Sequence, residues 1–356
     1  MTTIALVLGS GGARGNAHIG VIQVLEEQGF DIVSVSGCSM GSVVGGMYAA
    51  GKLPSFTEWV SGLSRFDVFR LVDMSLLSMG AIRGEKIYAI LEASLGDQLI
   101  EDLPIPYTAV ATDLVKQQEV WFQSGKIMHA IRASVAVPGL ITPVAEKNRF
   151  LMDGGLLNPV PIMPTVADQA DLIIAVNLNT NVGGSGSIQD SLFNITDFND
   201  DLKAPNASAT KSQRTHLQWN KMEMLNQCFE TMQATMAKYK MAGYAPDVEV
   251  KIDRNACSFF ELYRAKEMIE VGRNAALDAL QVKKKFDYYL INIKNSARVR
   301  ASSRNLPSNT EVFMLAFCFC TPRIIMHMCC ASITTPTPFA LVTSIMASAI
   351  CLVMFS

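Results

Sequence analysis

One short motif in the sequence has residue types and spacing that suit a nucleophilic serine. Residues 37–41 read Gly-Cys-Ser-Met-Gly, between a predicted strand at 31–36 and a predicted helix of small residues at 42–50. Glycines on both sides leave room for a sharp strand-to-helix turn, and the helix N-terminus directs free amides at the serine oxygen. This context favours Ser39 as a catalytic nucleophile over the alternative of a purely structural turn.

A serine hydroxyl needs a base at neutral pH, and the histidines are poor candidates for that role. Two lie in predicted helices, where structural roles are more common, one in a polar segment and one in the tail. They are His18, His129, His216 and His327. Asp153 is the better candidate, because it ends a predicted strand and precedes two glycines. A partly desolvated carboxylate can accept the serine proton. The alternative is an aspartate that only caps an Asp-Gly turn.

A glycine-rich loop, residues 9–15 (Gly-Ser-Gly-Gly-Ala-Arg-Gly), joins the first predicted strand to the first predicted helix. Its spacing fits neither the Gly-x-Gly-x-x-Gly dinucleotide fingerprint nor a Walker loop, which argues against nucleotide binding. Flexible amides at Gly11 and Gly12, beside a helix N-terminus, suit an oxyanion hole. Arg14 either orders this loop or attracts an anionic head group.

Strands that alternate with helices predict an α/β fold with three layers, α/β/α, around a mainly parallel central sheet. The active site is expected at the carboxyl edge of the strands. The predicted strands are 4–8, 31–36, 107–112, 119–122, 150–152, 172–177 and 248–252, and the predicted helices are 17–28, 42–50, 85–94, 126–134, 216–242 and 260–280. The Met- and Leu-rich stretch 71–79 is expected to pack over the core or to line an acyl-chain channel.

Composition limits the class of protein. Hydrophobic residues make up 49% and charged residues 17%, with a net charge of −2, which is a globular composition without the basic surface of a nucleic-acid binder. Of eight cysteines, five crowd the last 40 residues. The main body therefore offers neither a disulfide framework nor metal-ligand spacing, and no metal or cofactor is expected. The N-terminus opens directly into a strand, which favours a cytoplasmic location.

The chain is expected to divide into a hydrolase domain at 1–290 and a tail at 297–356. Within the first part, residues 181–216 are rich in Gly, Ser, Asn and Asp and predict a mobile polar insertion. The tail is apolar and rich in cysteine, and residues 339–355 carry no charge over about the minimum length of a membrane span. It is a membrane anchor, which would make the protein membrane-associated, a non-native or disordered end, or a packed part of the fold.

The order of these motifs resembles that of the patatin-like phospholipase family, and more closely its bacterial neuropathy-target-esterase-type branch. The resemblance covers about residues 3–285. It rests on the motifs already given and on Gly80-Ala-Ile-Arg-Gly84, Ala130-Ile-Arg-Ala-Ser134 with Pro138-Gly139, and Asp153-Gly-Gly-Leu-Leu-Asn-Pro159. Ser10 departs from the glycine that many relatives carry, without changing the amide. The tail beyond residue 297 has no counterpart.

The resemblance implies a Ser39–Asp153 dyad without histidine, with Gly11 and Gly12 as oxyanion donors. The expected activity is hydrolysis of carboxylic esters of phospholipids or lysophospholipids through an acyl-enzyme, on substrate taken up at a membrane surface. No nucleic acid or nucleotide partner is implied. The alternative is a catalytically idle, lipid-binding regulatory protein on the same fold.

Overall fold

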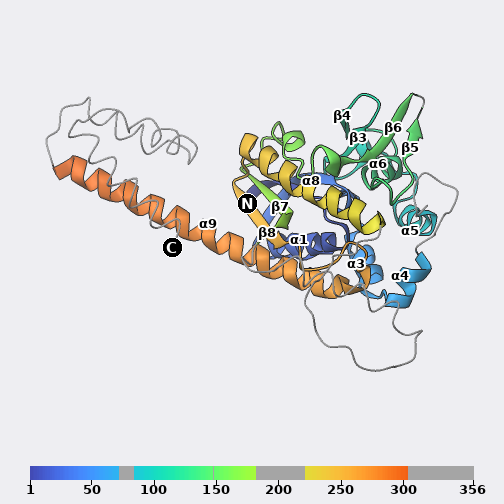
Figure 1. The fold of residues 1–356 in the computed structure, drawn as a ribbon. Coiled ribbons are helices and arrows are strands. Elements are labelled where there is room, and N and C mark those ends of the chain that lie inside the picture. The colour runs from blue at the N-terminus through green and yellow to red at the C-terminus, as the bar shows by residue number, and fades with distance from the viewer. Residues whose placement is uncertain (72–83, 147, 182–220, 304–356) are drawn as a thin grey trace, which may run out of the picture. The chain divides into compact units, whose positions relative to one another are not determined.

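The computed structural model describes residues 1–71, 84–146, 148–181 and 221–303 (Figure 1). The strands are β1 (Thr2–Leu8), β2 (Phe30–Cys38), β3 (Tyr107–Asp113), β4 (Gln118–Phe122), β5 (Val144–Glu146), β6 (Arg149–Asp153), β7 (Leu172–Thr180) and β8 (Val248–Asp253). The helices are α1 (Ala17–Glu27), α2 (Met40–Ala49), α3 (Leu53–Ser61), α4 (Arg65–Leu71), α5 (Glu85–Leu95), α6 (Ile127–Ser134), α8 (Lys221–Gly243) and α9 (Ala265–Ser303).

The eight strands form one mixed sheet in the order β5-β6-β3-β2-β1-β7-β8, with β4 paired to β3. Five neighbouring strands run parallel to one another, and along the sheet they are β8, β7, β1, β2 and β3. At the other end, β4 and β6 both run antiparallel to β3, and β5 runs antiparallel to β6. The predicted parallel core is therefore present, and an antiparallel corner extends it.

The two faces of the central strands pack against different helices. Because alternate side chains of a strand point to opposite faces, Ile4, Leu6 and Leu8 of β1 enter one core while Val7 enters another. The larger core also contains side chains from α1, α2, α3, α5, α6 and α9. Val7 packs with Ala237 of α8, which crosses the opposite face (Figure 1). These are the three layers expected from the sequence.

Among the α-helices and strands that the structure describes, three were not predicted from the sequence: α3, α4 and β5. Conversely, the helix predicted at 260–280 begins only at Ala265, after a 3-10 turn at Leu262–Arg264, and α9 continues to Ser303. The polar insertion beyond residue 181, the stretch 72–79 and the tail beyond residue 303 lie outside the described residues. So do His216 and His327.

The chain separates into two compact units, Met1–Val282 and Lys283–Ser356. The sheet and the helices that cover it belong to the first unit, while α9 begins in the first and continues into the second. Among the described residues no helix is both long and apolar enough to cross a membrane. Within the same ranges, no group of three or more His, Cys, Asp or Glu side chains is placed to hold a metal ion.

Candidate active site

Ser39 occupies a tight turn between β2 and α2. Its backbone has φ 54° and ψ −125°, a left-handed conformation that costs a non-glycine residue about 1–3 kcal/mol. A Cβ on Gly41 would lie 2.1 Å from the carbonyl oxygen of Leu8, and one on Gly37 would lie 2.3 Å from that of Gly41. Only glycine fits at either position, so the Gly-x-Ser-x-Gly spacing is a steric requirement of this turn.

The strained turn is held by Ser134, the last residue of α6. The amide of Ser39 donates to Ser134 Oγ at 2.9 Å, and that hydroxyl donates to the carbonyl oxygen of Val110 at 2.7 Å. Ser134 is fully buried. It therefore ties the backbone of the candidate nucleophile to β3. Nothing in the local sequence assigned this role to Ser134, because the partner lies 95 residues away along the chain.

The register of β3 brings Asp153 to Ser39. One edge of β3 is paired with β4 over residues 109–113, so β2 and β6 must share the other edge. There, Cys38 at the end of β2 lies opposite Val110, and Asp153 at the end of β6 lies opposite Ala111. Since β2 and β6 run in opposite directions, their carboxyl ends meet. Asp153 thus arrives from an antiparallel strand, rather than from the parallel set on which the sequence argument rested.

The carboxyl of Asp153 is fully buried. Its Oδ1 accepts the amide of Gly155 at 2.7 Å, and the Cys38 thiol lies 3.9 Å from the same oxygen. Burial raises the pKa of this carboxyl from 3.8 to about 7, against the opposing effect of a side-chain hydrogen bond from Ser39. Oδ2 of Asp153 has no hydrogen-bond partner among the described residues. A pKa near 7 suits a general base.

The glycine-rich loop contains two amides that make no hydrogen bond within the described part of the chain. The neighbouring amides are occupied, with Ser10 N donating to Pro159 O and Ala13 N to Phe259 O. For Gly11 and Gly12, no acceptor is found among the described residues. Gly12 has a φ of 55° and lines the same pocket as Ser39. The amides of Gly11 and Gly12, which are expected to form an oxyanion hole, are therefore available to donate to a substrate oxygen.

Several buried side chains fasten this loop. Gln233 of α8 donates to Ser10 Oγ at 2.7 Å, and Asn179 donates to the carbonyl oxygen of Ser10 at 3.1 Å. The His18 ring hydrogen-bonds the carbonyl oxygen of Gly9 at 2.8 Å, and burial lowers the pKa of His18 to about 4. His18 is consequently neutral at physiological pH. Its contact supports the loop, in keeping with the structural role expected for it.

Arg14 is also buried, and protein groups hold its guanidinium. Its Nη1 donates to Glu230 of α8 at 3.1 Å and to the carbonyl oxygen of Cys257 at 3.2 Å. These contacts link the loop to two distant parts of the chain. They favour the loop-ordering interpretation of Arg14 over contact with an anionic head group.

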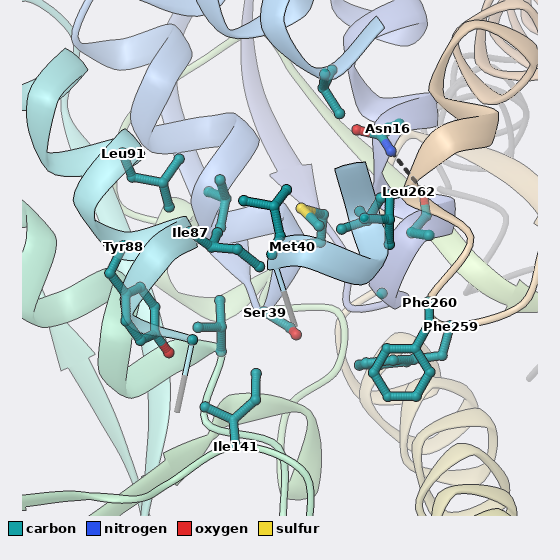
Figure 2. A pocket seen from close by; sticks show the side chains of 18 of the residues that line it. Asn16, Ser39, Met40, Ile87, Tyr88, Leu91, Ile141, Phe259, Phe260 and Leu262 are labelled. Carbon is teal, nitrogen blue, oxygen red and sulfur yellow. Dashed lines mark hydrogen bonds between the residues drawn. The ribbon is translucent and has the colours of Figure 1, made fainter. Parts of the chain in front are cut away.

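Ser39 lines an apolar pocket, although only 3% of the residue's surface is exposed. Figure 2 shows its hydroxyl among Tyr88, Ile141 and Phe259. The lining comes mainly from α2, α3, α4, α5 and the segment 259–262, and it includes Met40, Val43, Phe56, Trp59, Val60, Val68, Leu71, Ile87, Leu91, Val135, Val137, Phe260 and Leu262. Such a lining suits an aliphatic chain attached to a group that a nucleophile at Ser39 could attack.

Comparison with known proteins gives matches of three kinds. A family model described as patatin-like phospholipase matches residues 6–166. An uncharacterised NTE family protein of Mycobacterium tuberculosis is 38% identical over 328 residues, 78% of this chain and 91% of that protein. Lysophospholipase nte1 of Emericella nidulans is 30% identical over 196 residues, 53% of this chain and 12% of that protein. The crystal structure of VipD from Legionella pneumophila aligns over 79% of this chain and 67% of that one, with a TM-score of 0.49 and 15% identity.

Proposed function

This chain belongs to the NTE family of patatin-like phospholipases, and we propose that it is a serine hydrolase that cleaves carboxylic esters of phospholipids or lysophospholipids. The support for this proposal is that the register of β3 sets Asp153 beside Ser39, and that Ser39 lines an apolar pocket. The fungal relative named lysophospholipase supports the same class of substrate.

In the proposed reaction, ionised Asp153 accepts the proton of Ser39 as the serine oxygen attacks the ester carbonyl carbon. The amides of Gly11 and Gly12 donate to the oxyanion of the tetrahedral intermediate. Collapse of the intermediate breaks the ester bond, and Asp153 returns the proton to the leaving alcohol. Asp153 then takes a proton from water, which attacks the acyl-enzyme, and it returns that proton to Ser39 Oγ as the bond to the serine breaks and the fatty acid is released. No step requires a metal or an organic cofactor.

The burial of Asp153 accounts for the absence of histidine from this scheme. A solvated aspartate has a pKa near 4 and is a weak base at neutral pH. Desolvation raises the pKa of Asp153 to about 7, which brings its basicity to that of an ordinary histidine. Because Oδ2 of Asp153 has no hydrogen-bond partner among the described residues, one carboxylate oxygen is available for the serine proton.

Turnover of a soluble ester and of lipids by matched variants tests the proposal. The purified protein should hydrolyse p-nitrophenyl butyrate and a 1-acyl lysophospholipid, and Ser39→Ala and Asp153→Asn should each lower kcat by at least about a thousandfold. Ser34→Ala and Asp113→Asn are matched controls, because Ser34 is a buried serine of β2 and Asp113 a buried carboxyl of β3. Full activity in folded Ser39→Ala, or no hydrolysis by the unaltered protein, would contradict the proposal.

A further inference from the structure

Helix α4 is apolar on two opposite faces. Val68 and Leu71 line the pocket that contains Ser39. Phe66 and Phe69, also three residues apart and therefore on a common face, are 59% and 68% exposed. A helix that only covered the pocket would carry polar residues on its outer side. Two neighbouring exposed phenylalanines instead indicate a surface that meets an apolar partner.

Another exposed aromatic side chain, Phe260, stands two residues before a 3-10 turn that contacts α4. The 3-10 turn Leu262–Arg264 packs against α4, and the Arg65 guanidinium lies 4.8 Å from the centre of the Tyr263 ring. Just before this turn, Phe260 is 43% exposed and also lines the pocket. The wall of the pocket and the exposed aromatic surface are therefore built from the same two segments.

The charges on α4 favour an anionic lipid surface. Arg65 and Arg70 flank the two phenylalanines, and the Arg70 guanidinium lies 4.4 Å from the centre of the Phe66 ring. The one acidic residue of the helix, Asp67, accepts the amide and the hydroxyl of Ser64 and so caps the start of the helix. Aromatic rings with adjacent arginines suit the bilayer interface, where the rings enter the acyl boundary and the cations meet phosphate groups.

We propose that Phe66 and Phe69, flanked by Arg65 and Arg70 and continued by Phe260, dock this protein on an anionic phospholipid bilayer. The inference rests on the proposed function and adds the route of the substrate. Docking through the outer face of α4 sets the lipid surface one helix away from the pocket wall at Val68 and Leu71. An acyl chain can then pass from bilayer to pocket while little of its apolar surface meets water, and exposing that surface is the main cost of extracting a lipid.

Vesicle binding tests this surface separately from catalysis. Full-length protein carrying Ser39→Ala, which cannot consume lipid, is sedimented with phosphatidylcholine vesicles with and without phosphatidylglycerol. Adding Phe66→Ser and Phe69→Ser should weaken binding by at least about tenfold, and phosphatidylglycerol should strengthen binding of the parent. Tyr239→Ser is the matched control, because Tyr239 is 71% exposed on α8 and is not among the residues that line the pocket. It should bind as the parent does.

The outcomes separate the two proposals. With Ser39 restored, the Phe66→Ser, Phe69→Ser protein should keep kcat/KM for p-nitrophenyl butyrate within about twofold while hydrolysis of vesicle lipid falls with binding. Equal vesicle binding by the parent and this variant would overturn the docking surface. Unaltered protein that binds vesicles but hydrolyses neither p-nitrophenyl butyrate nor vesicle lipid would overturn the proposed function alone.

A tryptophan probe provides a second test that does not depend on removing the aromatic rings. The emission of Phe69→Trp, measured relative to the unaltered protein, should shift to the blue when vesicles are added, and brominated lipid should quench it. If vesicles bind and the emission does not change, the protein meets the bilayer through a surface that does not include residue 69, and the proposal is contradicted.

Discussion

The substitution Asp153→Asn should stabilise the folded protein at neutral pH even though it removes the proposed base. Burial raises the pKa of the Asp153 carboxyl from 3.8 to about 7. Between these values the folded protein holds a proton that the unfolded chain releases. The stability that this protonated carboxyl contributes is complete below pH 4 and is lost progressively as the pH rises through 7. Asparagine does not ionise, and its amide oxygen can still accept the amide of Gly155.

The size of the effect follows from the shift in pKa. One pKa unit corresponds to about 1.4 kcal/mol, so the unaltered protein loses about 4 kcal/mol between low pH and pH 8. About 2.5 kcal/mol of that loss falls between pH 5 and pH 8. The stability gap between Asp153→Asn and the unaltered protein should widen by this amount over the same interval.

Urea unfolding followed by circular dichroism at pH 5 and pH 8 measures that gap. Ser39→Ala serves as the control, because it removes the other member of the proposed dyad and keeps the titrating carboxyl. Since the hydrogen bond from Ser39 lowers the pKa of Asp153, this variant should show a pH dependence at least as large as that of the unaltered protein. A gap that is the same at both pH values would refute the assignment of a raised pKa to Asp153, and with it the argument that burial makes this carboxyl a base.

Three further predictions concern the site. Ser134→Ala removes the acceptor of the nucleophile's amide, and it should lower kcat by about ten- to a hundredfold with little change in KM; an equal change in both constants would argue against a positioning role. Gly41→Ala places a Cβ 2.1 Å from the carbonyl oxygen of Leu8 and should prevent folding, whereas Gly243→Ala, whose Cβ would meet nothing within 4 Å, should leave the melting temperature nearly unchanged. For a soluble ester, kcat/KM should rise about tenfold per pH unit and level off above an apparent pKa of about 7, the pKa of Asp153; a profile that is flat from pH 5 to 8 would refute this.

The sequence predicts a structural element correctly where residues within a few positions determine its backbone conformation. The run of apolar residues in β1, the glycines around Ser39 and the small residues of α2 each restrict the backbone within a few positions, and the elements predicted there are present. The fold class follows from the same alternation of strands and helices. The α/β layers and the parallel core were therefore available from the sequence.

Features that depend on distant contacts were not available. The antiparallel direction of β6 is set by its pairing with β3, about 40 residues away. The sequence of Arg149–Asp153 predicts a strand but does not indicate its direction in the sheet. The part played by Ser134 requires the meeting of α6 with the Ser39 turn. Helix α4 escaped prediction for a related reason: its apolar residues face both the pocket and the surface, so no helical periodicity of polar and apolar residues marks it.

Active-site labelling is the sharpest test of whether Ser39 is a nucleophile activated by Asp153. Purified full-length protein is treated with a fluorophosphonate, and the modified peptide is identified by mass spectrometry. A single adduct is expected on Ser39, lost in Ser39→Ala and formed at least about a hundredfold more slowly in folded Asp153→Asn. An adduct on another residue, an unchanged rate in Asp153→Asn, or no labelling of folded, lipid-binding protein would contradict it, and the last result would favour the idle regulatory alternative.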